Sequence, residues 1–172
     1  MKDQQRTTSD MNILIVDDTP DNLRILVGLL SEQGYLVRPA ASGSQALNAV
    51  REKQPDLILL DVKMPGMDGY EVCERLKAAE RTRDIPVIFI SALGEIEDKV
   101  RGFEVGGVDY ITKPFQNQEV LARIHTHLKL VHLQSQLKAR NEELENRNLE
   151  LKNKMDGLVK SRQNLEHLAH KE

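Results

Sequence analysis

Five polar side chains stand directly after apolar runs of the sequence. Asp17 and Asp18 follow one run, Asp61 follows another, and Ser91 and Lys113 follow two more. A single aspartate in such a place is also what an ordinary turn uses, because Asp favours turns. Several such places in one chain indicate a common site instead of unrelated turns.

The residue types predict a particular chemistry. Three carboxylates that share a site raise the pKa of one another unless a cation neutralises them. A carboxylate-rich site with oxygen ligands suits Mg²⁺, which keeps several waters and prefers to bridge to phosphate. An amine and a hydroxyl beside it are donors for phosphate oxygens. We therefore expect a site that places a phosphoryl group next to Mg²⁺.

The elements that must position these residues alternate between strand and helix. The predicted strands cover residues 12–16, 35–40, 57–60, 85–90 and 108–112. The predicted helices cover residues 20–34, 42–53, 69–79, 95–105 and a stretch that begins near residue 116. Thr19 is expected to cap the first helix with its hydroxyl, ahead of Pro20 in the first turn.

This alternation, with short strands of Val, Ile and Leu, predicts an α/β fold in which helices cover both faces of a doubly wound, five-stranded parallel sheet. Ligands bind such sheets at the carboxyl ends of the strands, which is where the five polar residues fall. The glycine pattern of dinucleotide-binding folds does not follow the first predicted strand.

A leucine repeat dominates the sequence after Phe115. No Gly or Pro interrupts the chain between Phe115 and Gly157. With the repeat at the d positions, Asn141 and Asn148 occupy a positions, where Asn favours two-stranded, in-register pairing. A single solvated helix is the alternative, but a leucine stripe without another core needs something to bury it. The leucines at this strict spacing of seven are Leu130, Leu137, Leu144, Leu151, Leu158 and Leu165.

Composition narrows the classes of function. The chain has 172 residues and a net charge of −3, so no global basic field recruits nucleic acid or anionic lipid. Cys73 is the only cysteine, which excludes an internal disulfide framework and fits a reducing compartment. No apolar run approaches the roughly 20 residues of a membrane span, and no signal peptide is visible. We expect a cytoplasmic protein without direct nucleic-acid or membrane contacts.

The motifs LIVDD, LLDVKMPGMDGYE, ISA and YITKPF, in this order and spacing, resemble the receiver domain of two-component response regulators. The resemblance implies a flavodoxin-like sheet with strand order 2-1-3-4-5. It implies that Asp61 accepts a phosphoryl group from a histidine kinase or a phosphotransfer protein. It also implies that Asp18 binds Mg²⁺ directly, that Asp17 binds it through water, and that the backbone carbonyl of Lys63 is a further ligand.

The same resemblance assigns residues that sense the phosphoryl group. Ser91 and Lys113 stand where the family has its hydroxyl and its lysine. Tyr110, three residues before Lys113, stands at the aromatic switch position. Pro114 follows the lysine where the family usually has a cis peptide bond. Val108 replaces an acidic residue that the family often has outside the site.

The predicted organisation is a disordered segment at 1–10, a receiver domain at 11–127, and a parallel dimeric coiled-coil helix at 128–172 that continues the fifth receiver helix. No DNA-recognition helix follows the receiver. We expect no enzyme activity apart from phosphoryl transfer to Asp61.

Two hypotheses cover the output of the chain. In the first, the coiled coil passes the phosphorylation state to an output domain outside this chain. Residues 165–170 weakly resemble the linker that enters diguanylate cyclase domains, and a kinase or phosphatase is the alternative output. In the second hypothesis, the chain is a complete receiver whose coiled-coil tail makes it a phosphorylation-gated interaction module.

Overall fold

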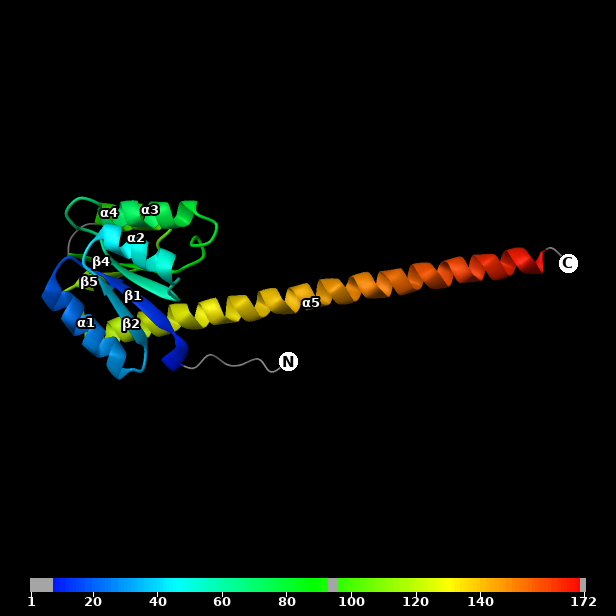
Figure 1. The fold of residues 1–172 in the computed structure, drawn as a ribbon, viewed down its shortest axis with the longest axis horizontal. Coiled ribbons are helices and arrows are strands. Elements are labelled where there is room, and N and C mark those ends of the chain that lie inside the picture. The colour runs from blue at the N-terminus through cyan, green and yellow to red at the C-terminus, as the bar shows by residue number, and fades with distance from the viewer. Residues whose placement is uncertain (1–7, 93–95, 171–172) are drawn as a thin grey trace. The chain divides into compact units, whose positions relative to one another are not determined.

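The computed structural model describes residues 8–92 and 96–170. The chain divides into two units, Met1–Lys129 and Leu130–Glu172. The elements alternate in the predicted order (Figure 1). After a short 3-10 helix, η1 (Thr8–Asp10), they are β1 (Asn12–Val16), α1 (Pro20–Glu32), β2 (Leu36–Ala40), α2 (Gly43–Glu52), β3 (Leu57–Asp61), α3 (Gly69–Ala78), β4 (Val87–Ala92), α4 (Ile96–Glu104), β5 (Asp109–Lys113) and α5 (Asn117–Ala169).

The five strands form one parallel sheet in the order β2-β1-β3-β4-β5, which confirms the predicted fold. Every residue of β1 and β3 is buried. Such continuous burial is expected because helices cover both faces of the sheet. One face packs against α2 and α3, and the other against α1 and the first turns of α5 (Figure 1).

Most elements differ from the predicted bounds by one or two residues, and three differences matter for the site or for the predicted organisation. Ser91 lies inside β4 and Lys113 ends β5, because each strand continues its pairing with its neighbour beyond the apolar run. Thr8–Asp10 form η1 although the sequence predicts a disordered segment over 1–10; residues 1–7 lie outside the described part of the chain.

The prediction that the Thr19 hydroxyl caps α1 is wrong. Pro20 begins α1 as expected, but the Thr19 hydroxyl makes no capping hydrogen bond. The backbone N–H of Thr19 donates instead to Oδ1 of Asp17, at 2.8 Å. A carboxylate of the predicted site therefore fixes the loop between β1 and α1.

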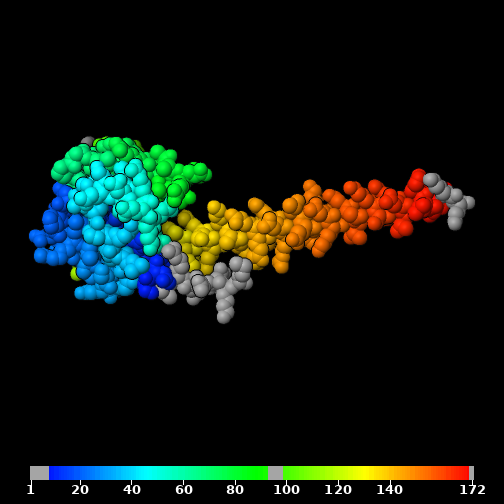
Figure 2. Space-filling model, viewed as in Figure 1, coloured from blue at the N-terminus to red at the C-terminus, as the bar shows by residue number. Residues whose placement is uncertain are grey.

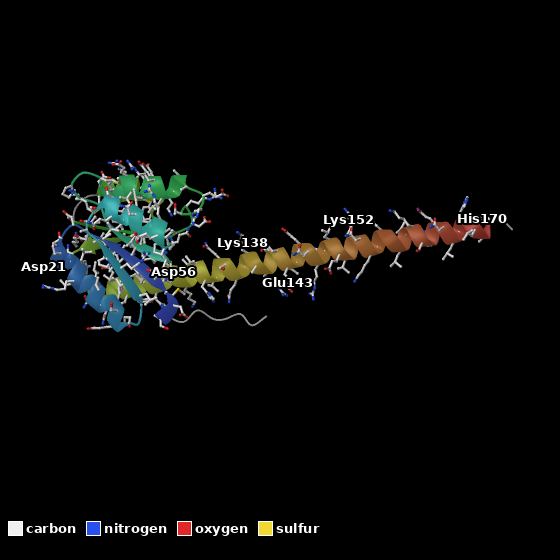
Figure 3. The ribbon with its side chains drawn as sticks, viewed as in Figure 1. Asp21, Asp56, Lys138, Glu143, Lys152 and His170 are labelled. Carbon is white, nitrogen blue, oxygen red and sulfur yellow. The ribbon has the colours of Figure 1, made fainter. Side chains whose placement is uncertain are left out.

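Residues 130–169 of α5 make up most of the second unit. From Leu133 to the end of the described chain every residue is exposed. The space-filling view shows this unit as a single helical rod of side chains (Figure 2). Lys138, Glu143 and Lys152 extend from the helix into solvent (Figure 3). Among the described residues, no helix has the length and apolar character that crossing a membrane requires.

We predict that Gly69→Ala lowers the free energy of unfolding by about 1–3 kcal/mol, because an added Cβ would overlap the backbone carbonyl oxygen of Asp61. Gly28→Ala is the matched control, since nothing lies within 4 Å of a Cβ there. Gly28→Ala should raise the free energy of unfolding by about 0.5–1 kcal/mol. Urea denaturation measures both variants. Equal effects in the two would contradict this close approach at the end of β3.

Candidate functional site

Three carboxylates meet at the carboxyl edge of the sheet, as the sequence predicts. Val16 lies opposite Leu60 in the pairing of β1 with β3, so the residues that follow them, Asp17 and Asp61, end level with each other. Asp17 is 0% exposed and Asp61 is 4% exposed. Asp18 is exposed, and all three residues offer carboxylate oxygens within 4.8 Å of one another.

Lys113 links two of these carboxylates. Its Nζ lies 3.1 Å from Oδ2 of Asp17 and 3.2 Å from Oδ1 of Asp61. The strand that carries Lys113 is two positions away from β3 in the sheet, so the long side chain crosses the end of β4 to reach them. One ammonium group thus holds two buried carboxylates in fixed positions.

Asp17 has two further partners that the sequence did not indicate. The Thr19 N–H donates to Oδ1 at 2.8 Å, and Nδ2 of Asn22 donates to Oδ2 at 3.1 Å. Asn22 lies in the first turn of α1, which Pro20 begins. The sequence contains one indication of the contact between Asn22 and Asp17, which is that Asn22 lies five residues after Asp17 and just inside a predicted helix.

A cavity of about 280 Å³ opens beside Asp61. Ser91 reaches it from β4 and is 4% exposed. This volume lies below the range of typical pockets for drug-sized ligands, so the cavity suits a small group instead of a nucleotide. Its lining consists of Asp18, Thr19, Asp61, Val62, Lys63, Ser91, Ala92 and Lys113.

Charge in the site is unbalanced. Burial, together with the nearby charge of Asp17, raises the pKa of Asp61 to about 6, although the ammonium group of Lys113 acts to lower it. Burial opposes the charged form of Lys113, but Asp61 and Asp17 outweigh it and raise the pKa of the ammonium group. Lys113 therefore stays protonated, and three carboxylates face one ammonium group. This oxygen-rich donor set fits a divalent cation such as Mg²⁺.

The predicted switch residues lie on neighbouring strands. Ser91 lies opposite Thr112, next to Lys113, and Tyr110 lies opposite Phe89. Tyr110 is 6% exposed, so its side chain is in the buried position. The Lys113–Pro114 peptide bond is cis, as the resemblance implies. Lys63 lines the cavity, and the role of its carbonyl as a ligand stays a prediction.

Comparison with known proteins identifies the family. The family profile described as response regulator receiver domain matches residues 13–125. The Synechocystis "DNA-binding dual master transcriptional regulator RpaA" is 45% identical over 117 residues, which are 68% of this chain and 48% of that protein. The Caulobacter vibrioides "Response regulator PleD" is 45% identical over 121 residues, which are 69% of this chain and 27% of that protein.

Solved structures agree with this match. A signal receiver domain of a histidine kinase from Syntrophus aciditrophicus aligns with a TM-score of 0.66 at 38% identity, and covers 70% of this chain and 92% of that one. The Vibrio cholerae chemotaxis protein CheY4 aligns with a TM-score of 0.65 at 28% identity, over 67% and 97% of the two chains. The chain belongs to the response regulator receiver family, and it spans about half or less of the length of these two curated relatives.

The raised pKa of Asp61 predicts how stability depends on pH in metal-free protein. The folded state binds the Asp61 proton more tightly than the unfolded state, so ionised Asp61 destabilises the fold once pH rises through about 6. In EDTA at pH 8, Asp61→Asn should therefore increase the free energy of unfolding by about 2–3 kcal/mol.

The gain should shrink as pH falls below the folded pKa and vanish near the unfolded value of about 4. Urea denaturation at several pH values measures it. Added Mg²⁺ should narrow the difference at pH 8, because the cation stabilises the ionised parent. An Asp61→Asn variant that is less stable than the parent at pH 8 in EDTA would contradict the charge imbalance.

Proposed function

We propose that Asp61 of this receiver accepts a phosphoryl group from a phosphohistidine, carried by a histidine kinase or a phosphotransfer protein. The surroundings of the Asp61 carboxylate are the main support for this proposal. The Asp61 carboxylate ends a buried strand in a small cavity, with an ammonium group at 3.2 Å and two more carboxylates within reach of a shared cation. This arrangement positions a nucleophile and neutralises charge, which are the main requirements of phosphoryl transfer.

The residues of the site divide the work of the reaction. A carboxylate oxygen of Asp61 attacks phosphorus, and the O–P bond forms as the P–N bond to the donor histidine breaks, leaving its electron pair on the imidazole nitrogen. Lys113 holds Oδ1 of Asp61 and offsets the charge of the phosphoryl oxygens.

Asp17, Asp18 and the carbonyl of Lys63 would hold the metal with Asp61. When bound, Mg²⁺ supplies positive charge that neutralises the carboxylate and phosphoryl oxygens.

Ser91 and Tyr110 transmit the state in this proposal. The Ser91 hydroxyl lines the cavity and can donate a hydrogen bond to a phosphoryl oxygen on Asp61. Phosphorylation then favours the packing in which Ser91 lies toward the site and Tyr110 lies inward. The change is a shift between two populated packings of the same fold.

The exposed leucine repeat supports a homodimer through a parallel coiled coil. Leu137, Leu151 and Leu158 are 62%, 56% and 70% exposed in the single chain, at the spacing of a coiled-coil seam. The remaining seam residues are Leu130, Asn141, Leu144, Asn148 and Leu165. A helix of about 40 residues spans on the order of 60 Å, so it can transmit a change in helix register over that distance.

Two outputs fit such a dimer. An output domain beyond the coil is favoured, with a diguanylate cyclase ahead of a kinase or phosphatase. A Vibrio cholerae protein named "Probable cyclic di-GMP phosphodiesterase" is 44% identical over 121 residues, which are 27% of its length. Its name supports an output in cyclic dinucleotide turnover. A stand-alone interaction module is the alternative, and whether the reading frame continues past residue 172 distinguishes the two.

We predict that acetyl phosphate with Mg²⁺ labels the chain with an acid-stable, base-labile phosphoryl group. EDTA should abolish labelling, because the crowded carboxylates cannot accept an anionic group unaided. Asp18→Ala should lower labelling more than Asp17→Ala, if Asp17 acts through water. Asp21→Ala is the matched control, since Asp21 is an exposed acid in the first turn of α1 that pairs with Arg24 (Figure 3). Equal labelling with and without EDTA would contradict the proposed metal requirement.

We predict that the unphosphorylated chain sediments as a dimer at concentrations on the order of tens of micromolar, and that the double variant Leu144→Lys/Leu151→Lys is monomeric because it places charges in the seam. Leu149→Lys is the control, since Leu149 is 59% exposed but lies at a b position outside the seam. A monomeric parent, or a seam variant of unchanged mass, would remove the coiled coil from the mechanism.

A further inference from the structure

Three aromatic side chains, Tyr70, Phe89 and Tyr110, belong to the hydrophobic core on the α2 and α3 side of the sheet. Phe89 of β4 packs between two tyrosines, with ring centroids 5.4 Å from Tyr70 and 5.5 Å from Tyr110. The two tyrosine hydroxyls lie 2.8 Å apart and form a buried hydrogen bond. Tyr70 is 2% exposed. The sequence motifs indicate a switch role for Tyr110 but none for Tyr70.

The hydrogen bond joins the two segments that build the site. Tyr70 is the second residue of α3, at the end of the loop that begins at Asp61. Tyr110 lies in β5, three residues before Lys113. The same two segments are joined at the site by the ion pair between Lys113 and Asp61, at 3.2 Å. The hydrogen bond and the ion pair thus join the same two segments of chain.

Helix α4 contacts the tyrosine pair through three consecutive residues. The guanidinium carbon of Arg101 lies 4.6 Å from the centroid of the Tyr70 ring. A Cβ on Gly102 would lie 2.5 Å from Cε2 of Tyr110. The ring of Phe103 lies 6.3 Å from that of Tyr110. Helix α4 thus contacts both tyrosines.

We propose that Tyr70 is a positioning residue for the switch, and that its hydroxyl holds Tyr110 in the buried position before any phosphoryl group arrives. Tyr110 cannot move outward without breaking the hydrogen bond and leaving the Tyr70 hydroxyl buried without this partner, which is unfavourable. The unphosphorylated chain therefore already favours the packing in which Tyr110 is buried. Phosphorylation then causes a smaller change in the population of that packing. This inference rests on the switch role proposed for Tyr110.

Fluorine NMR of protein labelled with 3-fluorotyrosine tests the inference, because the chain has only three tyrosines and no tryptophan. Tyr35→Phe assigns the Tyr35 resonance, which then serves as an internal reference. In unphosphorylated Tyr70→Phe, a soluble paramagnetic agent should broaden the Tyr110 resonance because its exposed population rises roughly fivefold, as the loss of one ordinary hydrogen bond predicts. A Tyr110 resonance as protected as in the parent would overturn the proposal.

Two further measurements separate this idea from a general loss of packing and from failure of the proposed function. Phenylalanine at either position keeps the ring contact with Phe89. Each single variant and the double variant Tyr70→Phe/Tyr110→Phe lose the same hydroxyl hydrogen bond. The double variant should therefore have a melting temperature no lower than that of either single variant. Additive losses would contradict a shared bond. Acetyl phosphate with Mg²⁺ should restore burial of Tyr110 in Tyr70→Phe. If the parent takes no phosphoryl group, the proposed function fails, while the unphosphorylated spectra still decide the role of Tyr70.

Discussion

The ammonium group of Lys113 between Asp17 and Asp61 is the contact on which the rest of the site depends. Two buried carboxylates at level strand ends repel each other, so a nearby cation is needed to hold them together. Lys113 supplies that cation from a strand two positions away, which is possible only because β4 and β5 follow β3 in the sheet. The charge arrangement therefore depends on the strand order, since another order would separate these residues.

The same contact leaves negative charge in the site unbalanced, and this excess charge suits the site to a divalent cation and a phosphoryl group. One ammonium group faces three carboxylates, so burial and Asp17 keep the pKa of Asp61 raised to about 6. A fully compensated ion pair would be more stable but would not attract a divalent cation. Destabilising charge at a functional site, offset by a well-packed sheet, is a common compromise in proteins. Asp17 also has a structural role, because it accepts hydrogen bonds from Thr19 and Asn22 at the start of α1.

The sequence predicted the sheet and the meeting of Asp17, Asp18 and Asp61 because both leave local signals. Continuous apolar runs indicate strands buried on both faces, and a polar residue at the end of such a run points to the ligand-binding edge. What depends on contacts between distant segments was missed. Ser91 and Lys113 lie within strands because they pair with the neighbouring strand. The Thr19 hydroxyl does not cap α1, because the Asp17 carboxylate already takes the Thr19 N–H. No local pattern indicated that Tyr70 and Tyr110 meet.

Borohydride trapping can show whether Asp61 forms an acyl phosphate. Reduction converts a phosphorylated aspartate to homoserine, which mass spectrometry locates in a peptide digest. After treatment with acetyl phosphate and Mg²⁺, we expect homoserine at position 61, with Asp17 and Asp18 unchanged. Homoserine at Asp17 or Asp18, or a stable phosphoryl group on another residue with Asp61 intact, would contradict it.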